Sequence, residues 1–451
     1  MKGDWADYTV EQIAAKSPYA LATGPFGSSI GSRFFQTEGI PVIRGGNLSQ
    51  DVGIKLIDAD WVFVSREKAA QFSRSIVRSG DLVFTCWGTI DQIGLIDETS
   101  PYPEYVISNK QMKLTPNATR FDSHFLYYLF KSPGIRDVIL SRGIGSSVPG
   151  FNLGQLRRMR ISAPPLATQK AIANVLRALD DKIRLNRKMN LVLEALASAL
   201  FKSWFVDFDA VTAKRDGKTP VGVPVDALDL FPGHFEDSEL GPIPKGWTMG
   251  RLCEITAVVD CLHSKKPERQ KTGRPLLQLD NIADAGLMDL SDLYLVSDQD
   301  YTRWSERIEA SPGDCVITNV GRVGAVGQIP QGFRAALGRN MTGLRSIIGT
   351  PTFLIECLLS TAMREEIEKK TDAGTILEAL NVSALPGLRF VRPPSALILL
   401  FEGLCRPFRS LMESHVEHNS LLSSLRDTVL LPLLSGEISI KTAEKTVAEV
   451  V

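Results

Sequence analysis

The sequence lacks the features that mark several common protein classes. No run approaches the roughly 18 apolar residues that a membrane-spanning helix needs, and the opening stretch MKGDWADYTVEQI has no apolar signal-peptide core. The six cysteines lie far apart without a Cys-x-x-Cys pair, so neither a zinc site nor a disulfide framework is indicated. We therefore expect a cytoplasmic protein with reduced thiols and no membrane association.

Catalytic motifs are also missing. The sequence has no P-loop for ATP, no His-Glu-x-x-His zinc motif and no Asn/Asp-Pro-Pro-aromatic motif of an adenine methyltransferase. Gly321, Gly324 and Gly327 have the wrong spacing for a phosphate loop and are expected in a hairpin or bulge. Only 5 histidines are available for general-base chemistry. We expect no catalytic, cofactor-binding or metal-binding residues, and hence a chain that is not an enzyme.

The chain has no net basic charge. Its 51 Lys and Arg residues balance 51 Asp and Glu residues, which by itself argues weakly against nucleic-acid binding. The balance is uneven along the chain, since residues 1–205 are basic and residues 206–246 are acidic. Phosphate binding requires a local positive face rather than a positive total, so the charge balance does not exclude DNA as a ligand.

An internal repeat is the main positive feature of the sequence. Landmark residues return in the same order, with an offset that drifts only from 234 residues between Pro41 and Pro275 to 229 between Pro164 and Pro393. The landmarks of the first copy are Pro41, Asn47, Gly80, Asp81, Val83, Thr85, Gly88, Gly94, Gly145, Asn152, Leu156, Pro164 and Pro165. Those of the second copy are Pro275, Asn281, Gly313, Asp314, Val316, Thr318, Gly321, Gly327, Gly374, Asn381, Leu385, Pro393 and Pro394. A unit made twice with different side chains between shared landmarks suggests one binding task performed on two targets.

Each copy begins with a strand-rich globule, over residues 1–165 and 247–394. Short apolar runs such as GDLVFTCWG (80–88) and GDCVITNVG (313–321) are bounded by turn residues, as is typical of strands. Shorter helices are predicted within the globules at 122–131 and 352–370. A chain of 451 residues is long enough for two to three domains of this kind.

A long helix with an apolar seam follows each globule. The seam residues alternate in spacings of four and three, the pattern of a coiled coil. The first seam, within 166–205, comprises Ile172, Leu176, Leu179, Ile183, Asn186, Asn190, Leu193, Ala197 and Leu200. The second, within 395–435, comprises Leu397, Phe401, Leu404, Phe408, Leu411, His415, His418, Leu422, Leu425 and Val429. Pro407 lies inside the second helix and is expected to kink or restart it.

Both seams become polar at the same place, at Asn186 and Asn190 in the first and at His415 and His418 in the second. We interpret these residues as a satisfied polar layer that fixes the register of the helices. A metal site or pH switch built on the two histidines is the alternative.

The relative direction of the two helices decides what they do. Parallel pairing would put both globules at the same end, whereas antiparallel pairing relates the two units by an approximate two-fold axis and puts them at opposite ends. A helix of about 39 residues spans about 58 Å. Proteins with two-fold symmetry read DNA half-sites roughly 34 Å apart. Antiparallel pairing therefore fits the reading of two short sequences separated by unread base pairs.

Several stretches carry a family resemblance. The segment PPLATQKAIANVLRALDDKIRLNRKMNLVLEALASALFKSWFVDFDAV (164–211) resembles the central conserved region of type I restriction–modification specificity subunits. GPFGSSI (24–30) is similar to the opening of the first target-recognition domain of that family, and LFPGHFEDSELGPIPKGW (230–247) to the lead-in to its second. PLLSGEISI (432–440) resembles its C-terminal conserved end. The resemblance covers nearly the whole chain, and the pairing of KIRLNRKMN with FKSWFVDF is very specific.

The resemblance implies an α+β fold, with two mixed α/β target-recognition domains that have strand-rich cores and two long helices that form an antiparallel coiled coil. It divides the chain into target-recognition domain 1 (1–165), the central conserved helix (166–205), a linker (206–246), target-recognition domain 2 (247–394), the C-terminal conserved helix (395–435) and a tail (436–451).

The same resemblance implies a function. The chain would be the non-catalytic DNA specificity subunit of a type I restriction–modification complex, and each domain would read one half of a bipartite asymmetric target. Its partners would be double-stranded DNA, two modification (methyltransferase) subunits that dock on the helices, and ATP-dependent restriction subunits. S-adenosylmethionine and ATP with Mg²⁺ would be bound by those subunits and not by this chain.

Candidate DNA contacts are polar residues on the loops that flank the repeated strands. Arg and Lys favour guanine, Asn and Gln favour adenine, and small hydroxyls hold phosphates. In the first globule the candidates are Ser28, Ser29, Arg33, Arg44, Asn47, Asn109, Lys110, Gln111, Arg142, Ser146 and Ser147. In the second they are Lys265, Lys266, Arg269, Gln278, Asn281, Arg322, Arg339, Asn340 and Thr375. Residues that read sequence should differ between the copies, as Arg44 and Gln278 do, whereas Asn47 and Asn281 recur and are expected to serve the fold or shared backbone contacts.

The first long helix also carries candidate docking residues. Arg184, Arg187 and Lys188 beside the seam are either solvated or face a partner or phosphate. The aromatic end of this helix is denser than an isolated helix should expose, and it is expected to pack against the linker or a modification subunit. The residues of this end are Phe201, Trp204, Phe205 and Phe208.

A different class of function stays open. In a tandem adaptor the same globules would bind protein partners without DNA sequence readout, and the coiled coil would only oligomerise. The neutral net charge favours this interpretation slightly. Weak binding to duplex DNA at all salt concentrations would support it, and steep salt dependence would count against it.

Overall fold

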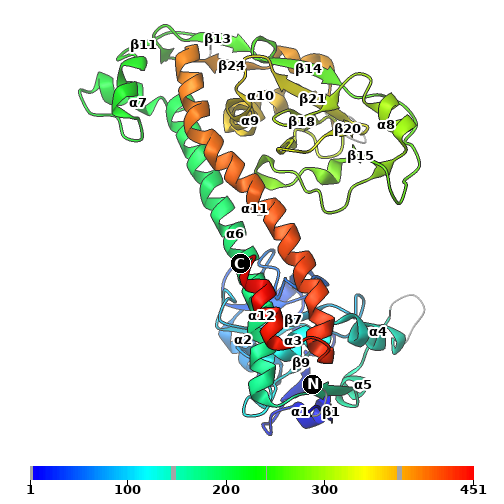
Figure 1. Cartoon of the computed structure of the whole chain (residues 1–451). Coiled ribbons are helices and arrows are strands. Elements are labelled where there is room, and N and C mark those ends of the chain that lie inside the picture. Colours follow the sequence, from blue (N-terminus) through cyan, green and yellow to red (C-terminus); the bar gives the residue numbers. More distant parts are fainter. Residues whose placement is uncertain (1–3, 144–148, 240, 373–377) are drawn as a thin grey trace. The chain divides into compact units, whose positions relative to one another are not determined.

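The structure is a computed structural model that describes residues 4–143, 149–239, 241–372 and 378–451, without the side chains of Ser28 and Asp226 (Figure 1). Its internal contacts divide the chain into two compact units. The first unit comprises Met1–Arg184 and Leu421–Val451, and the second comprises Leu185–Ser420. Each unit therefore contains one globule and a part of both long helices.

The first globule is built from short strands, which form two four-stranded sheets and one two-stranded sheet. These strands are β1 (Ala6–Thr9), β2 (Leu21–Thr23), β3 (Ile40–Ile43), β4 (Val62–Val64), β5 (Ile76–Arg78), β6 (Leu82–Thr85), β7 (Ile93–Leu95), β8 (Glu104–Ile107), β9 (Gln111–Leu114) and β10 (Arg160–Ala163). One sheet has the antiparallel order β2-β9-β6-β7. The other has the order β4-β3-β8-β5, in which β3 and β8 are parallel. The antiparallel pair β1 and β10 joins the two ends of the globule.

Strand β6 shows why an unbroken apolar run forms a strand here. Its residues Leu82 and Phe84 belong to the core that contains α3 (Ser123–Lys131), whereas Val83 belongs to a separate core with Ile43 and Tyr105. A strand that buries both faces has no polar alternation, which explains the continuous apolar sequence.

The second globule repeats this topology. Its strands are β13 (Thr248–Arg251), β14 (Thr256–Asp260), β15 (Arg274–Leu277), β16 (Leu295–Val296), β17 (Glu309–Ala310), β18 (Cys315–Thr318), β19 (Val326–Gln328), β20 (Ala335–Leu337), β21 (Met341–Ser346), β22 (Thr371–Asp372), β23 (Ala379–Leu380) and β24 (Arg389–Arg392). The two main sheets have the orders β14-β21-β18-β19 and β16-β15-β20-β17, and β13 pairs with β24. The parallel pair is again present, between β15 and β20.

Matching strand registers confirm the repeat. Val83 pairs with Gly94 across β6 and β7, and Val316 pairs with Gly327 across β18 and β19. All four are landmarks that the sequence shares between the copies. The glycines of the second copy therefore lie in a β-hairpin and not in a phosphate loop, as predicted.

Short helices accompany the sheets. In the first globule they are α1 (Val10–Ile13), α2 (Arg66–Ala70), α3, α4 (Pro133–Ser141) and α5 (Leu153–Arg157). In the second they are α8 (Asp298–Trp304), α9 (Pro351–Leu359) and α10 (Thr361–Lys369). The helix predicted at 122–131 is confirmed as α3. The single helix predicted at 352–370 is wrong, because α9 ends before Ser360, whose side chain accepts a hydrogen bond from the backbone of Met363 and caps α10.

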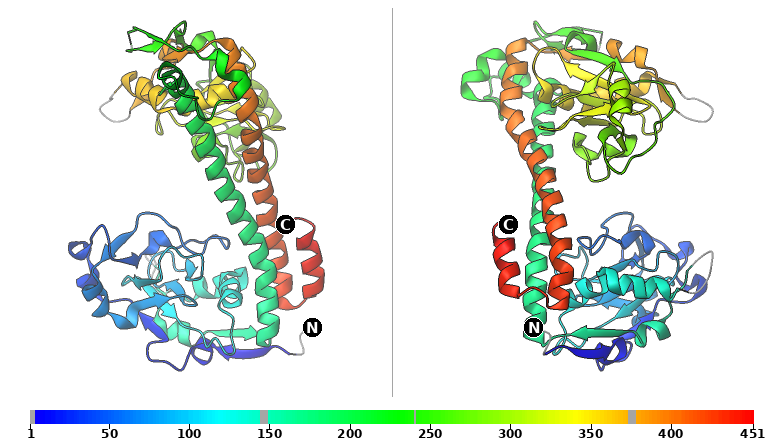
Figure 2. Two further views of the ribbon diagram at one scale, coloured as in Figure 1. Left: turned by 90° about the vertical axis from the view of Figure 1, so that its left-hand side faces the viewer. Right: turned by 45° about the vertical axis from the view of Figure 1, so that its right-hand side comes forward.

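Two long helices, α6 (Leu166–Phe205) and α11 (Ser395–Ser435), lie side by side in both views of Figure 2. In the first unit Asp180 of α6 pairs with Arg426 of α11. In the second unit Asn190 of α6 contacts His415 of α11. Residues later in α6 thus meet residues earlier in α11, and the helices are antiparallel, as the predicted fold class required.

Most residues of the predicted seams are buried or half-buried. Leu411 is the exception, because it is 41% exposed and the neighbouring Met412 is buried instead, so the predicted second seam was wrong at this position. Ile172, Leu176 and Ile183 share one core with Leu422 and Val429 in the first unit. In the second unit the ring centroids of Phe201 and Phe401 lie 5.5 Å apart.

Pro407 does not restart α11, which runs as one helix from Ser395 to Ser435. Of the two predicted alternatives, the restart was wrong and the kink stays a prediction. Proline removes the N–H that would bond the carbonyl of Gly403. Both residues are exposed, so water can take the place of that donor.

The linker and tail contain further elements, namely α7 (Asp209–Arg215), β11 (Phe235–Glu236), β12 (Ile243–Pro244) and α12 (Ile440–Ala448). The linker covers the aromatic end of α6, because Trp204 packs on Phe231. Trp247, the first residue of the second globule, packs on Phe205. Phe201 and Phe205 also contact Phe353 of α9. The prediction that this end packs against the linker is thus confirmed. No helix in the described ranges is long and apolar enough to cross a membrane.

Candidate nucleic-acid interface

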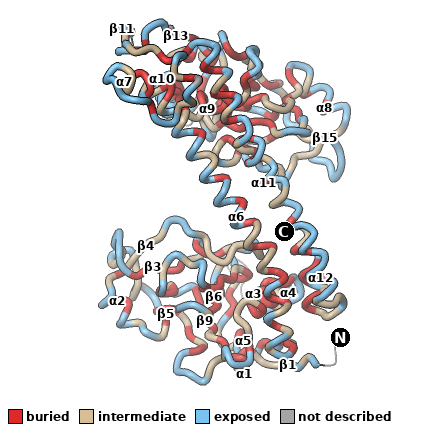
Figure 3. Tube along the Cα trace, turned by 60° about the vertical axis from the view of Figure 1, so that its left-hand side comes forward, coloured by how far each residue is buried: buried red, intermediate tan, exposed pale blue. Residues whose placement is uncertain are grey.

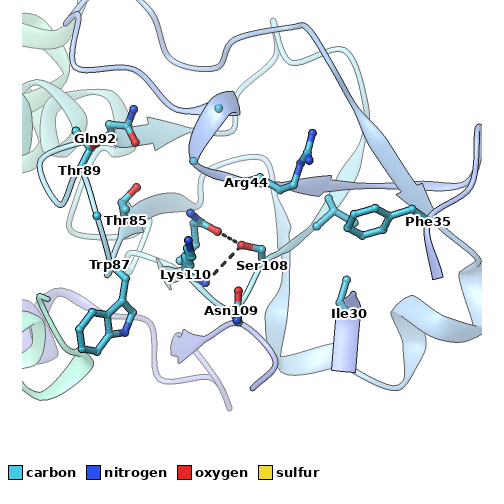
Figure 4. A pocket seen from close by; sticks show the side chains of 15 residues that line it. Ile30, Phe35, Arg44, Thr85, Trp87, Thr89, Gln92, Ser108, Asn109 and Lys110 are labelled. Atoms are coloured by element: carbon cyan, nitrogen blue, oxygen red, sulfur yellow. Dashed lines mark hydrogen bonds between the residues drawn. The ribbon is translucent and has the colours of Figure 1, made fainter. Parts of the chain in front are cut away.

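An open cavity of about 550 Å³ lies in the first globule (Figure 4). Its wall comes mainly from the loops after β3, β6 and β8. The residues that line it are Ile30, Phe35, Val42, Arg44, Gly45, Gly46, Thr85, Trp87, Gly88, Thr89, Gln92, Ser108, Asn109, Lys110 and Gln111. Segments that are far apart in sequence thus converge on one concave surface that carries both polar and apolar side chains.

Sheet topology causes this convergence. Because β3 and β8 are parallel, Arg44 and Ser108 leave the same edge of the sheet, and Ser108 N donates to Ile43 O at 3.0 Å. The other sheet pairs Thr85, at the end of β6, with Gln111, at the start of β9. The short turn from β8 to β9 then joins the two sheets and completes the wall.

Four of the predicted DNA contacts line this cavity, namely Arg44, Asn109, Lys110 and Gln111. Asn109 and Lys110 are exposed, whereas Gln111 is buried. Arg44 is held by its Nη2, which donates to Asp60 O at 2.7 Å. The cavity therefore combines accessible polar groups at its mouth with fixed ones on its wall.

The remaining candidates of the first globule lie elsewhere. Asn47 is buried and structural, because its Oδ1 accepts from Arg44 N and its Nδ2 donates to Ala59 O at 2.9 Å. Ser29, Arg33 and Arg142 do not line the cavity. Ser146, Ser147 and the side chain of Ser28 lie outside the described residues.

The predicted contacts of the second globule form two groups. Lys265, Lys266 and Arg269 are exposed between β14 and β15, where Lys266 Nζ lies 3.9 Å from the ring centroid of Tyr294 and Arg269 pairs with Asp292. The second group follows strands β15, β18 and β20, and its members are Gln278, Arg322, Arg339 and Asn340. Thr375 lies outside the described residues.

The second group corresponds to the cavity wall of the first globule. Gln278 follows β15 as Arg44 follows β3, and Asn340 precedes β21 as Lys110 precedes β9. Asn281 repeats the role of Asn47, because its Oδ1 accepts from Gln278 N at 2.8 Å. The two globules therefore share a backbone frame and present different side chains at equivalent places.

The polar layer of the seam is satisfied by hydrogen bonds. Nδ1 of His415 donates to Asn190 Oδ1 at 2.7 Å, and Asn190 Nδ2 donates to Met412 O at 3.1 Å. Asn186 Nδ2 donates to Asn419 Oδ1 at 2.9 Å. His415 thus acts as a hydrogen-bonding partner within the coiled coil, and the role of the polar layer in setting register stays a prediction.

An exposed apolar stripe on α6 was not predicted from the sequence. Leu185, Met189, Val192 and Leu196 recur at spacings of four, three and four and are between 38% and 58% exposed. Exposed segments of α6 are pale blue in Figure 3. The stripe has the spacing of a second coiled-coil seam beside the buried one, and the same search for periodic apolar residues applied to the rest of the helix would have found it.

Comparison with known proteins places the cavity in a recognised family domain. A family model described as "Type I restriction modification DNA specificity domain" matches residues 4–195. The MjaIX specificity subunit of a type I restriction enzyme from Methanocaldococcus jannaschii is 26% identical over 413 residues, which cover 88% of this chain and 88% of the relative. The HindI specificity subunit from Haemophilus influenzae is 24% identical over 382 residues, with coverages of 74% and 81%. The chain resembles type I restriction specificity subunits.

A solved structure agrees with this family resemblance at the level of the fold. The S subunit of a type I restriction–modification system from M. genitalium matches with a TM-score of 0.56 and 15% identity, over 95% of this chain and 96% of that one. The specificity-domain match spans the first globule and most of α6, so the cavity and its four predicted contacts lie inside it. The resemblance predicted from the segment 164–211 is therefore confirmed.

Proposed function

We propose that this chain is the DNA specificity subunit of a type I restriction–modification complex, in which each globule reads one half of a bipartite asymmetric target. The observation that carries the proposal is the duplicated fold with divergent side chains at equivalent loop positions. Arg44 and Lys110 of the first copy stand where the second copy has Gln278 and Asn340. The shared backbone fold can make the same contacts to DNA phosphates in both globules, whereas different side chains can recognise different bases.

The two long helices would act as the spacer between the half-sites and as the docking site for modification subunits. Their antiparallel pairing supports the spacer role, because antiparallel helices are the connection expected of a chain that reads two half-sites of a duplex. The exposed stripe of Leu185, Met189, Val192 and Leu196 supports docking. Its heptad spacing fits a helix of a partner better than a flat surface, and apolar area of this kind marks an interaction site.

Catalysis would belong to the partners. Modification subunits would carry S-adenosylmethionine, and restriction subunits would carry ATP with Mg²⁺. Methyl transfer or ATP hydrolysis by the purified chain alone would contradict this part of the proposal.

Methylome sequencing tests the proposal. The full chain would be expressed with its modification subunits in a host without other adenine methylation, and methylated adenines would be mapped genome-wide. We expect a single motif made of two specific half-sites and an unspecified gap of fixed length. Methylation without such a motif would contradict it. DNA binding that is weak at every salt concentration, even with modification subunits present, would favour a protein-binding adaptor instead.

A further inference from the structure

We propose that Arg44, Thr85 and Gln111 read a guanine in the half-site of the first globule, with Trp87 closing one side of the reading site. This inference rests on the proposed function and goes further, because it assigns individual readers and the base they recognise. The inference is based on side-chain donor and acceptor atoms in the cavity wall that have no hydrogen-bond partner within the described part of the protein.

Three buried side-chain atoms from the cavity wall have no hydrogen-bond partner among the described residues. They are Arg44 Nε, Thr85 Oγ1 and Gln111 Nε2. Gln111 is 0% exposed and Thr85 is 2% exposed. Buried polar groups are paired in the great majority of cases, and exceptions grouped at one site point to a ligand that pairs them. All three residues line the cavity that a base would enter.

Two of the three side chains are anchored by their other polar atoms. Arg44 Nη2 donates to Asp60 O at 2.7 Å, and Gln111 Oε1 accepts from Ser108 Oγ. Because these other atoms are already hydrogen-bonded, Arg44 Nε and Gln111 Nε2 are the donors that remain available to a base. Anchoring also reduces the conformational entropy that binding would cost.

The chemistry of the free atoms selects the base. Guanine presents two adjacent acceptors, N7 and O6, on its major-groove edge. Adenine places a donor beside its acceptor, cytosine presents a donor, and thymine places a methyl group beside its acceptor. Two free donors therefore match guanine best, and Thr85 Oγ1 can serve as acceptor for the amino group of the paired cytosine.

The mouth of the cavity fits nucleic acid. Lys110 is exposed there and supplies positive charge for the phosphates. Trp87 is 53% exposed, and its ring lies so close to Gly150 that a Cβ at position 150 would come within 2.7 Å of it. Trp87 is thus a rigid apolar wall that a base or sugar can contact (Figure 4).

In the second globule, the equivalent polar side chains form hydrogen bonds to the protein's own backbone. Gln278, in the place of Arg44, donates through Nε2 to Leu277 O at 2.9 Å. Thr318, in the place of Thr85, donates to Arg322 O. Met341, which pairs with Thr318 as Gln111 pairs with Thr85, replaces the amide by an apolar side chain. The guanine-reading arrangement is therefore a property of the first globule.

Variants that carry the residues of the second copy test the assignment. Gln111→Met and Arg44→Gln would be assembled with modification subunits, and the methylated motifs would be compared with that of the wild type. We expect the wild type to require a guanine at one position of one half-site. Each variant should lower the preference for that guanine over other bases on the order of 10-fold to 100-fold and leave the other half-site unchanged. Met341→Gln is the matched control and should not alter that position.

Gln111→Glu separates base reading from damage to the fold. It keeps the shape of the side chain and replaces a donor by an acceptor, while Arg44 Nε stays a donor. The preferred base should therefore change from guanine to adenine, which places a donor beside its acceptor. An unchanged preference in all variants, or a uniform loss over all sequences without any change of base, would overturn the inference alone. A wild type that yields no bipartite motif would overturn the proposed function, and this inference with it.

Discussion

Asp180 of α6 and Arg426 of α11 form a buried ion pair, with Oδ1 and Nη1 2.9 Å apart and both side chains only 5% exposed. Tyr128 of α3 donates its hydroxyl to the other oxygen of Asp180 at 2.5 Å. Arg426 Nη2 also lies 3.5 Å from Asp51 Oδ1. This cluster joins both long helices to the first globule.

Replacing Arg426 by Met should lower the free energy of unfolding by about 3–5 kcal/mol, because the Asp180 carboxylate would remain buried without its counter-ion. Adding Asp180→Leu to Arg426→Met should recover much of this loss, since the double variant removes both charges. Urea unfolding measures both effects. The exposed pair of Asp181 and Arg184 is the control, and Asp181→Asn should cost about 0.5 kcal/mol or less. A cost for Arg426→Met no larger than for this control would show that the buried pair does not stabilise the cluster.

The exposed stripe of α6 should be required for assembly and not for folding. Val192→Glu and Leu196→Glu should abolish co-purification of modification subunits, because each places a charge in an apolar helix–helix contact. The thermal midpoint of the chain alone should change by no more than a few degrees, since both side chains are exposed.

Ser198→Glu is the matched control for these two variants. Ser198 is exposed and lies two residues after Leu196, which turns it about 200° round the helix from the stripe. The same charge at this position should leave co-purification intact. Retained co-purification of Val192→Glu and Leu196→Glu would contradict docking on the stripe.

The length of the helices should set the gap between the half-sites. Seven residues that continue the heptad would be inserted in α6 after Leu191, and seven more at the facing position in α11, after Glu413. At about 1.5 Å per residue this adds about 10 Å, or about three base pairs of duplex. Methylome sequencing should show both half-sites unchanged and a gap longer by about three base pairs. An insertion in one helix alone should abolish methylation, and an unchanged gap in the double insertion would argue against a spacer.

Glu356 should make stability depend on pH. Burial in α9 raises the pKa of this carboxyl to about 7, although Arg409 nearby acts to lower it. A carboxyl with a raised folded-state pKa contributes stability below its unfolded-state value near 4.5, and loses that contribution as the pH rises to about 7.

Glu356→Gln should therefore resemble the wild type near pH 4.5 and be more stable above pH 7, by about 3 kcal/mol at most. Urea unfolding of both proteins at about pH 5 and about pH 7.5 measures the difference. An equal difference at both pH values would show that titration of Glu356 is not its cause.

Sequence patterns predicted the parts of the fold that local periodicity determines. The alternating spacing from Ile172 to Leu200 specified α6, and the ordered landmarks specified the repeat. The break at Ser360 between α9 and α10 was missed because the apolar pattern continues across it.

The candidate site was predicted less completely, since it depends on pairing between distant strands. Arg44 and Lys110 could be selected from residue type and loop position. The parallel pairing of β3 with β8, which brings Arg44 beside Ser108, has no local signal. Thr85 and Trp87 were not selected for the same reason, because nothing in their own segment shows that it borders the cavity.

Exchange of one globule tests the central claim most directly. Residues 1–165 would be replaced by the corresponding domain of a relative with a different target, and methylated adenines would be mapped with the same modification subunits. We predict that one half-site changes while the other half-site and the gap are retained. A change in both half-sites, or in neither, would contradict the claim that two separate readers divide the target between them.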